Sequence, residues 1–217
     1  MSEVRILPNL VWKYNYEPGF DVQAFLDYQS KEAELHQTEA DGGKSTAGHP
    51  NPPHEWECNR DFMMWLRPKI EICLREWDVQ YTDIIATGSW TNIHNINAHT
   101  LPHDHGSTNV VVSAYVQVPQ DSGNLMFEQL LRTNWTHYSR IPEGTIHDYW
   151  KEVNVNTNDV LLFPGWMTHK TQASKSNGDR ITFTITFTAA AAIAAGGITT
   201  FATATATTTA TTTATTT

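Results

Sequence analysis

The spacing of apolar residues divides the chain into a helical first third and a strand-rich remainder. Residues 21–36 and 59–77 carry apolar side chains at helical spacing, so each segment is predicted to form a helix with one buried face. Asp21 is suited to cap the first helix, and Pro68 is expected to interrupt or restart the second. The apolar faces comprise Val22, Phe25, Leu26 and Ala33 in the first segment and Ile70, Cys73, Leu74 and Trp77 in the second.

Beyond residue 79, short runs rich in Val, Ile, Thr and aromatic residues alternate with turn signals. These runs are IIATGSWTNIH, NVVVSAYVQVP, GNLMFEQ, TIHDYWKEV, DVLLFPGW and RITFTITFT. Many short strands after N-terminal helices predict a mainly β domain, either a sandwich or a jelly roll, that is backed by the helices.

Two segments follow neither pattern. The polar loop of residues 37–57 is rich in glycine and proline and long for a compact domain, so we predict that it is a mobile lid. Residues 189–217 contain only Ala, Thr, Gly, Ile and Phe. We expect this low-complexity tail to be poorly ordered or to pack as an addition, and we assign it no chemistry. The predicted organisation is a helical support in residues 1–80, a β core in 81–188 and the tail.

The composition limits the binding partners and the cellular compartment that we expect for this protein. The formal net charge is −9, which is unsuited to nucleic acid or to an anionic membrane surface. The chain has no apolar run of roughly eighteen residues, the length of a membrane span, and no recognisable signal peptide. Cys58 and Cys73 are predicted to be reduced thiols rather than a disulfide or a metal site. We therefore expect a cytoplasmic protein with no nucleic-acid or membrane partner, and a homodimer is a candidate assembly.

Three histidines next to apolar strands form a candidate metal site. His103 and His105 precede a run of valines, and residues i and i+2 of an extended chain project to the same side. His169 follows the apolar run DVLLF and a Pro-Gly turn. Three imidazoles could hold a metal ion with its remaining positions open, as catalysis requires. A solvated or hydrogen-bonded pair is the alternative for the first two.

A candidate anion clamp follows His169 by eleven positions. Arg180 and Thr182 alternate with apolar residues that we expect to pack against the helices, so both should point into the space that the sheet encloses. A guanidinium beside a hydroxyl is suited to a carboxylate. We expect the buried guanidinium to be unpaired in the resting protein apart from water and Tyr115. The alternating apolar residues are Ile181, Phe183, Ile185 and Phe187.

These features resemble a known family, the iron(II)- and 2-oxoglutarate-dependent oxygenases, and in particular a small subgroup found in phages and marine bacteria. The resemblance spans residues 85–188 and rests on SWTNI, HDHGSTNVVVSAYVQVPQDSGNLMF and DVLLFPGWMTHKTQASKSNGDRITFTITF. It implies a double-stranded β-helix, a jelly-roll fold like that of cupins. In this family iron is held by an HxD or HxE pair and a distal His. Carried over by position, His103 is the first ligand and His169 the distal one.

The same resemblance implies how a cosubstrate is bound and what reaction follows. Arg180 and Thr182 match the RxS/T motif that grips 2-oxoglutarate, and Tyr115 resembles a tyrosine that assists it. Asn92 is a further candidate contact, although it could equally cap a turn. The implied cofactors are Fe(II), 2-oxoglutarate and O2. The implied reaction is hydroxylation of an unidentified substrate with release of succinate and CO2, with no catalytic residue beyond the metal centre.

The sequence departs from the family pattern at one ligand. His105 stands where most of the superfamily has a carboxylate, and an HxH pair is similar to that of the small subgroup. Asp104 faces the opposite side of the strand and cannot easily substitute. Three neutral imidazoles leave the metal one charge unit more positive than two histidines and a carboxylate do. In a less favoured variant, His105 is the first ligand and Ser107 takes the carboxylate position.

Two other functions stay open. The chain could be a three-histidine cupin-type dioxygenase without 2-oxoglutarate, in which Arg180 has no role. It could also be a non-catalytic jelly-roll module for binding or structure, which predicts no iron uptake and which the Ala/Thr tail would suit. Glu128 is a weak candidate ligand, and Trp166 is expected to be a core or rim aromatic. Four more histidines are expected to be loop or surface residues, namely His94, His99, His137 and His147.

Overall fold

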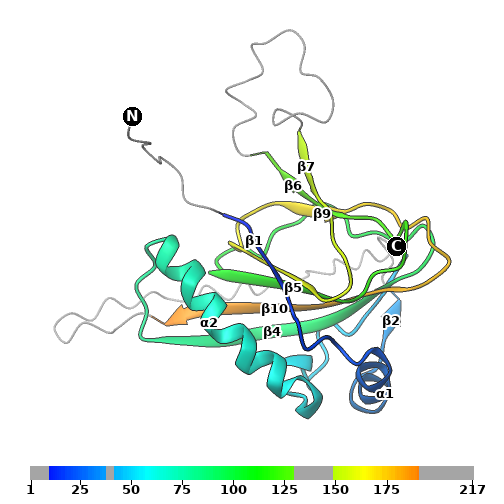
Figure 1. Cartoon of the computed structure of the whole chain (residues 1–217), viewed down its shortest axis with the longest axis horizontal. Coiled ribbons are helices and arrows are strands. Elements are labelled where there is room, and N and C mark those ends of the chain that lie inside the picture. The colour runs from blue at the N-terminus through cyan, green and yellow to red at the C-terminus, as the bar shows by residue number, and fades with distance from the viewer. Residues whose placement is uncertain (1–9, 38–41, 130–148, 191–217) are drawn as a thin grey trace, which may run out of the picture.

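The structure of the chain, a computed structural model, describes residues 10–37, 42–129 and 149–190. Two antiparallel sheets form the body, and α1 and α2 lie on the side of the larger sheet away from the smaller one (Figure 1). The larger sheet has the order β1-β8-β5-β10-β4-β3-β2, and the smaller has the order β7-β6-β9. The strands are β1 Trp12–Asn15, β2 His36–Gln37, β3 Lys44–Ser45, β4 Asp83–His94, β5 Val110–Gln117, β6 Leu125–Glu128, β7 Trp150–Val153, β8 Asp159–Phe163, β9 His169–Thr171 and β10 Arg180–Ala190.

β10 lies in the middle of the larger sheet and divides its two faces. It pairs with β4 on one side and with β5 on the other. The four apolar residues that alternate along it all belong to the core shared with the helices, as the pattern predicted. Arg180 and Thr182 therefore face the smaller sheet. The strand runs two residues into the predicted tail, and the rest of the tail, residues 191–217, lies outside the described residues.

α1, Val22–Glu32, begins where its capping residue predicted. The Oδ1 atom of Asp21 accepts a hydrogen bond from the backbone N–H of Ala24 at 3.0 Å. This bond satisfies one of the N–H groups that the first turn of a helix leaves without an internal partner. Two short 3-10 helices, η1 Pro53–Glu55 and η2 Glu57–Asn59, lead into the second long helix.

α2, Arg60–Glu76, continues through Pro68, so the predicted interruption is wrong. Proline removes only the N–H that would bond to the carbonyl four residues earlier, which here belongs to Met64. Met64 is 70% exposed and Pro68 is exposed as well, so the proline lies on the solvent-facing side of the helix. The apolar face of α2 is buried as predicted, with Ile70, Cys73 and Leu74 in the core.

The first 80 residues contribute strands as well as helices, which the sequence analysis missed. β1 pairs with β8 at one edge of the larger sheet, and β3 pairs with β4 toward the other edge. β1 has four residues and β3 has two, which is too short for an alternating pattern to be recognised. Part of the predicted lid therefore belongs to the sheet, while residues 38–41 within it lie outside the described residues.

Two apolar cores hold the layers together. The larger one fills the space between the helices and the outer face of the larger sheet, and the smaller one lies between the two sheets. Cys73 is fully buried in the larger core and Cys58 is exposed, and both are free thiols as expected. Within the part of the chain that the structure describes, no helix is both long enough and apolar enough to cross a membrane.

Candidate metal centre

The structure brings together the three histidines that the sequence singled out. His169 is the first residue of β9, and the backbone of His103 pairs with it in an isolated antiparallel bridge. The two reciprocal N–H···O bonds of this bridge measure 3.0 and 2.9 Å. His105 lies outside any regular strand, and its N–H donates to the carbonyl of Gly165 at 2.8 Å. Backbone pairing between distant segments, rather than one continuous strand, therefore places the three rings.

The imidazoles converge on one point. One nitrogen from each ring can be chosen so that all three lie within 4.8 Å of one another. The ring centroids are 5.1 Å apart for His103 and His105 and 4.3 Å apart for His103 and His169. Those of His105 and His169 are 5.2 Å apart. Nitrogens about 2.0–2.1 Å from one metal ion are about 3–4 Å apart, so rings whose nitrogens lie within 4.8 Å of one another could hold one ion after a small inward adjustment.

Hydrogen bonds orient two of the rings. The Nδ1 atom of His103 lies 2.8 Å from the carbonyl oxygen of Leu101, and that of His169 lies 2.8 Å from the carbonyl oxygen of Met167. A carbonyl only accepts, so Nδ1 carries the proton in both rings and Nε2 keeps its lone pair. A backbone partner on the far nitrogen is a common support for a metal-bound histidine.

The electrostatics of the cluster favour neutral rings. Burial, reinforced by the neighbouring His103, lowers the pKa of His105 to about 4 and that of His169 to about 3. Neutral imidazole is the form that binds a metal ion. The Nε2 atom of His105 is buried and has no hydrogen-bond partner among the described residues. An unpaired buried nitrogen beside two oriented ones fits a metal ligand, and three imidazoles suit a first-row ion such as Fe(II).

The two alternative ligands at this position lie elsewhere. The Oδ1 atom of Asp104 accepts a hydrogen bond from the N–H of Gly106 at 2.8 Å, in a local turn, and its carboxylate is not part of the histidine group. Ser107 lines a different hollow, which also contains Trp77 and Trp166. The variant with Ser107 in the carboxylate position therefore has no support in the geometry.

A cavity of about 380 Å³ adjoins the three histidines. Three of the four residues that the sequence assigned to the cosubstrate line it, namely Asn92, Tyr115 and Thr182. Burial raises the pKa of Tyr115 far above its usual value, so its phenol remains protonated and can donate a hydrogen bond. Ser45 and Ala47, from the segment predicted to be a lid, also line the cavity.

Arg180 is buried beside this cavity, but the expectation that its guanidinium would be unpaired is wrong. Nη1 donates to the carbonyl oxygens of Ser122 and Gly123 at 2.9 and 2.8 Å, and Nη2 donates to the Nδ1 atom of His94 at 2.6 Å. Its Nε–H is buried and has no partner among the described residues. The turn between β5 and β6 thus supplies partners that no local pattern around Arg180 could predict.

His94 is the site residue that the sequence analysis misplaced. It was expected at the surface, yet only 4% of it is exposed and it lines the cavity. A signal was present, because Trp90, Asn92 and His94 alternate along β4 and therefore share one face. All three line the cavity. A prediction that places Asn92 in the pocket therefore also places Trp90 and His94 there.

The weaker candidates do not join the site. Glu128, at the end of β6, is outside the histidine group. Trp166 is 48% exposed and belongs to the hollow that contains Ser107. His99 is partly exposed. Two further histidines, His137 and His147, lie outside the described residues.

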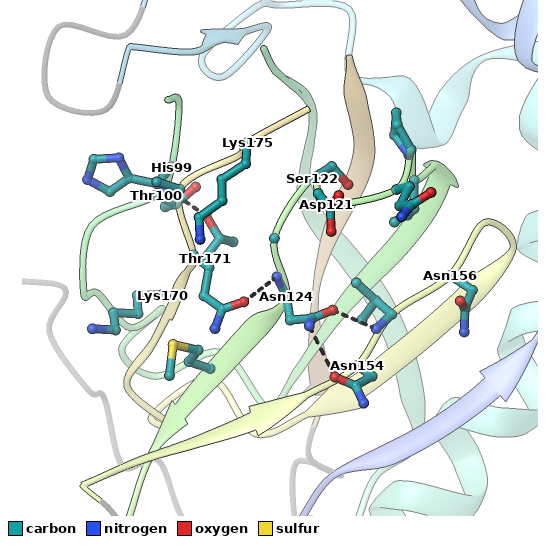
Figure 2. A pocket seen from close by; sticks show the side chains of 18 of the residues that line it. His99, Thr100, Asp121, Ser122, Asn124, Asn154, Asn156, Lys170, Thr171 and Lys175 are labelled. Atoms are coloured by element: carbon teal, nitrogen blue, oxygen red, sulfur yellow. Dashed lines mark hydrogen bonds between the residues drawn. The ribbon is translucent and has the colours of Figure 1, made fainter. Parts of the chain in front are cut away.

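A larger hollow of about 1000 Å³ lies along the smaller sheet and shares Thr100 and Thr171 with the cavity (Figure 2). It contains none of the three clustered histidines. Its central amide, Asn124, is already engaged: the side chain donates to Glu152 and Asn154 and accepts from the N–H of Val155. These hydrogen bonds leave Asn124 in a structural role within the hollow.

Comparison with known proteins gives a family match over the segment that contains this candidate site. Residues 88–186 match a family model described as "Putative 2OG-Fe(II) oxygenase". The matched range includes all three clustered histidines, Arg180 and Thr182. The comparison with curated proteins gave no match.

Solved structures share the fold at low sequence identity. A prolyl-4-hydroxylase from Pseudomonas putida has 13% identity and a TM-score of 0.56, with 82% of this chain and 91% of that chain covered. HygX from Streptomyces hygroscopicus, with nickel and 2-oxoglutarate bound, has 13% identity, a TM-score of 0.54 and 82% of each chain covered. The epimerase SnoN from nogalamycin biosynthesis has 13% identity and a TM-score of 0.53, with 82% and 76% covered. The predicted double-stranded β-helix is thereby confirmed.

Proposed function

We propose that this chain is a 2OG-Fe(II) oxygenase that hydroxylates a substrate with release of succinate and CO2. Two comparisons support this proposal: residues 88–186 match the family model of these enzymes, and the chain shares its fold with a solved prolyl-4-hydroxylase. The observation that carries this proposal is the convergence of three imidazoles beside a cavity lined by hydrogen-bonding side chains. The substrate is unidentified. The net charge of −9 supports a partner other than nucleic acid or an anionic membrane, and a homodimer is the assembly that we propose to test.

His103, His105 and His169 would hold Fe(II) through their free nitrogens. When bound, the iron would supply the redox chemistry with O2 and 2-oxoglutarate. The chain itself contributes position, since backbone carbonyls fix two of the rings and one of these rings, His169, is buried. With three neutral ligands the site keeps the full charge of the ion, which favours binding of an anionic cosubstrate.

Arg180, Thr182, Tyr115 and Asn92 would bind the far carboxylate of 2-oxoglutarate. The unpartnered Nε–H of Arg180 is a buried donor, and the phenol of Tyr115 is a second one. Thr182 and Asn92 lie opposite each other in the β10–β4 pairing and both line the cavity. A carboxylate that accepts several such bonds would be held in one orientation.

The proposal that the oxidation is a hydroxylation needs a separate argument. The prolyl-4-hydroxylase and HygX share this fold, but so does the epimerase SnoN. One fold can therefore host several outcomes of the same family of chemistry. Hydroxylation is proposed because no catalytic group beyond the metal centre is needed for it, and the described part of the cavity contains no carboxylate that could act as a separate acid or base.

The test is an anaerobic titration of the metal-free protein with Fe(II), with and without 2-oxoglutarate, followed by the visible charge-transfer band of the chelate. We expect a band only when both are present, and none in His169→Ala. His99→Ala removes a partly exposed imidazole outside the histidine group and is the matched control that should behave as the parent. Iron binding with no response to 2-oxoglutarate would favour the three-histidine cupin-type enzyme, and no iron binding would favour the non-catalytic module.

A further inference from the structure

The buried imidazole of His94 is the feature that the family resemblance does not account for. His94 is the last residue of β4 and lies opposite Arg180 in the β4–β10 register. Both side chains are almost completely buried, at 4% and 1% exposure. A polar ring in such a position is expensive to bury unless it makes hydrogen bonds. Its partners therefore indicate its role.

The partners fix both the tautomer and the direction of the ring. Arginine has no acceptor, so in the 2.6 Å contact with Nη2 of Arg180 the Nδ1 atom of His94 must accept. The proton of a neutral ring is then on Nε2, which lies 3.3 Å from the hydroxyl oxygen of Thr100 and donates to it. His94 therefore connects Arg180 with the segment that precedes the metal-site histidines.

Three contacts orient the guanidinium. Two backbone carbonyls engage Nη1 and His94 engages Nη2, so Nε is the one guanidinium nitrogen of Arg180 without a partner among the described residues. A guanidinium is planar, so fixing its two terminal nitrogens also fixes the direction of the Nε–H. Without an acceptor at the position of His94, Nη2 would be a buried donor with no partner, and the group would turn to find one.

The chain also holds the His94 ring from the other side. A Cβ atom on Gly43 would lie 2.6 Å from Cδ2 and 3.2 Å from Nε2 of His94, so the ring packs directly on the Gly43 backbone. The same Cβ would lie 3.1 Å from the carbonyl oxygen of Ile93. A methyl group at residue 43 would displace the imidazole without removing any polar group from the site.

We propose that His94 is a positioning residue for 2-oxoglutarate. Its neutral ring accepts a hydrogen bond from Nη2 of Arg180, and this bond directs the Nε–H of the guanidinium toward the far carboxylate of the cosubstrate. This inference rests on the proposed function. It assigns His94 no contact with iron, and it predicts that the acceptor at Nδ1 matters, not the presence of an imidazole as such.

Three variants separate these contributions. His94→Leu removes the acceptor and keeps most of the volume, His94→Asn keeps an acceptor near the place of Nδ1, and Gly43→Ala displaces the ring. At saturating Fe(II) without oxygen, the charge-transfer band gives the affinity for 2-oxoglutarate, and a titration with Fe(II) alone gives the affinity for the metal. His99→Ala is the control histidine variant.

We expect His94→Leu to weaken 2-oxoglutarate binding about ten-fold to a hundred-fold, the effect of one hydrogen bond to a charged group. Its Fe(II) affinity should equal that of the parent. His94→Asn should recover most of the loss, and Gly43→Ala should show part of it. Thermal unfolding identifies any variant that fails to fold, in which case Gly43→Ala and His94→Asn carry the test.

The outcomes separate this inference from the proposed function. If the parent shows no band with Fe(II) and 2-oxoglutarate, the proposed function is wrong, and the role proposed for His94 is then wrong as well. If the parent shows the band and folded His94→Leu binds 2-oxoglutarate as the parent does, only the role of His94 is wrong. Equal losses in His94→Leu and His94→Asn would also overturn it, because they would mean that the imidazole itself is required.

Discussion

His103 and His169 lie opposite each other across an isolated antiparallel bridge, and each donates its Nδ1–H to the carbonyl oxygen of the residue two positions earlier. The same local geometry is thus used twice, on two segments that the bridge holds together. It leaves Nε2 free on both rings and directs both into one cavity. The candidate metal centre therefore depends on backbone pairing, and the next turn of the chain adds the third ring, His105.

His105→Asp tests the ligand that departs from the family pattern. We expect this variant to bind Fe(II) and to bind it more tightly than the parent, because an anionic ligand neutralises part of the metal's charge. Isothermal titration without oxygen measures the change, with His99→Ala as the control. If the variant bound no metal, the site would depend on the length of the imidazole, and the charge argument would be wrong.

The two cysteines should differ strongly in reactivity. Burial raises the pKa of Cys73 to about 12, so at pH 8 only about one thiol in ten thousand is the reactive thiolate, and the side chain is fully buried. Cys58 is exposed. Native protein should therefore take up one equivalent of a thiol reagent, and Cys58→Ser should take up none. Labelling of native Cys58→Ser would show that α2 opens far more readily than its packing indicates.

Alternation along strands predicted most of the site because the strands that carry it alternate strictly. Thr182 and Tyr115 face the cavity as their positions in β10 and β5 required. The same rule applied to β4 would have placed His94 there beside Asn92. It was missed because a lone histidine at a strand end was assigned to the surface, an assumption about residue type rather than about geometry.

Contacts between distant segments could not be predicted from the sequence. The carbonyls that hold Arg180 belong to the turn at Ser122 and Gly123, 58 and 57 residues earlier in the chain. The alternation of side chains along a strand predicts the face of the sheet on which a residue lies. It does not predict which loop packs against that face. β1 was missed for a similar reason, since its four residues become a strand only by pairing with β8.

Thr182→Ala tests the weakest member of the proposed clamp. The hydroxyl would contribute one neutral hydrogen bond to the carboxylate, so we expect a loss of about 1 kcal/mol, or about five-fold in 2-oxoglutarate affinity. Fe(II) affinity should not change. Thr184→Ala, at the next position of the same face, is the matched control. A larger loss in the control than in Thr182→Ala would place the carboxylate further along β10.

Arg180→Ala should have two separable effects, because the structure gives the guanidinium two kinds of partner. Removing one member of a buried charged pair costs about 2 to 5 kcal/mol, so 2-oxoglutarate affinity should fall about thirty-fold to a few thousand-fold. The carbonyls of Ser122 and Gly123 would also lose their donor. We therefore expect the free energy of unfolding to fall by on the order of 1–3 kcal/mol, measured by urea denaturation of the metal-free protein.

Arg180→Lys distinguishes the two effects. An ammonium group can still donate to the turn carbonyls but cannot reproduce the planar fork, so stability should recover more completely than 2-oxoglutarate affinity. Fe(II) affinity should stay near that of the parent in both variants, since Arg180 is outside the histidine group. If Arg180→Ala lost stability but bound 2-oxoglutarate as the parent does, Arg180 would serve only to hold the β5–β6 turn, and the carboxylate would be bound elsewhere in the cavity.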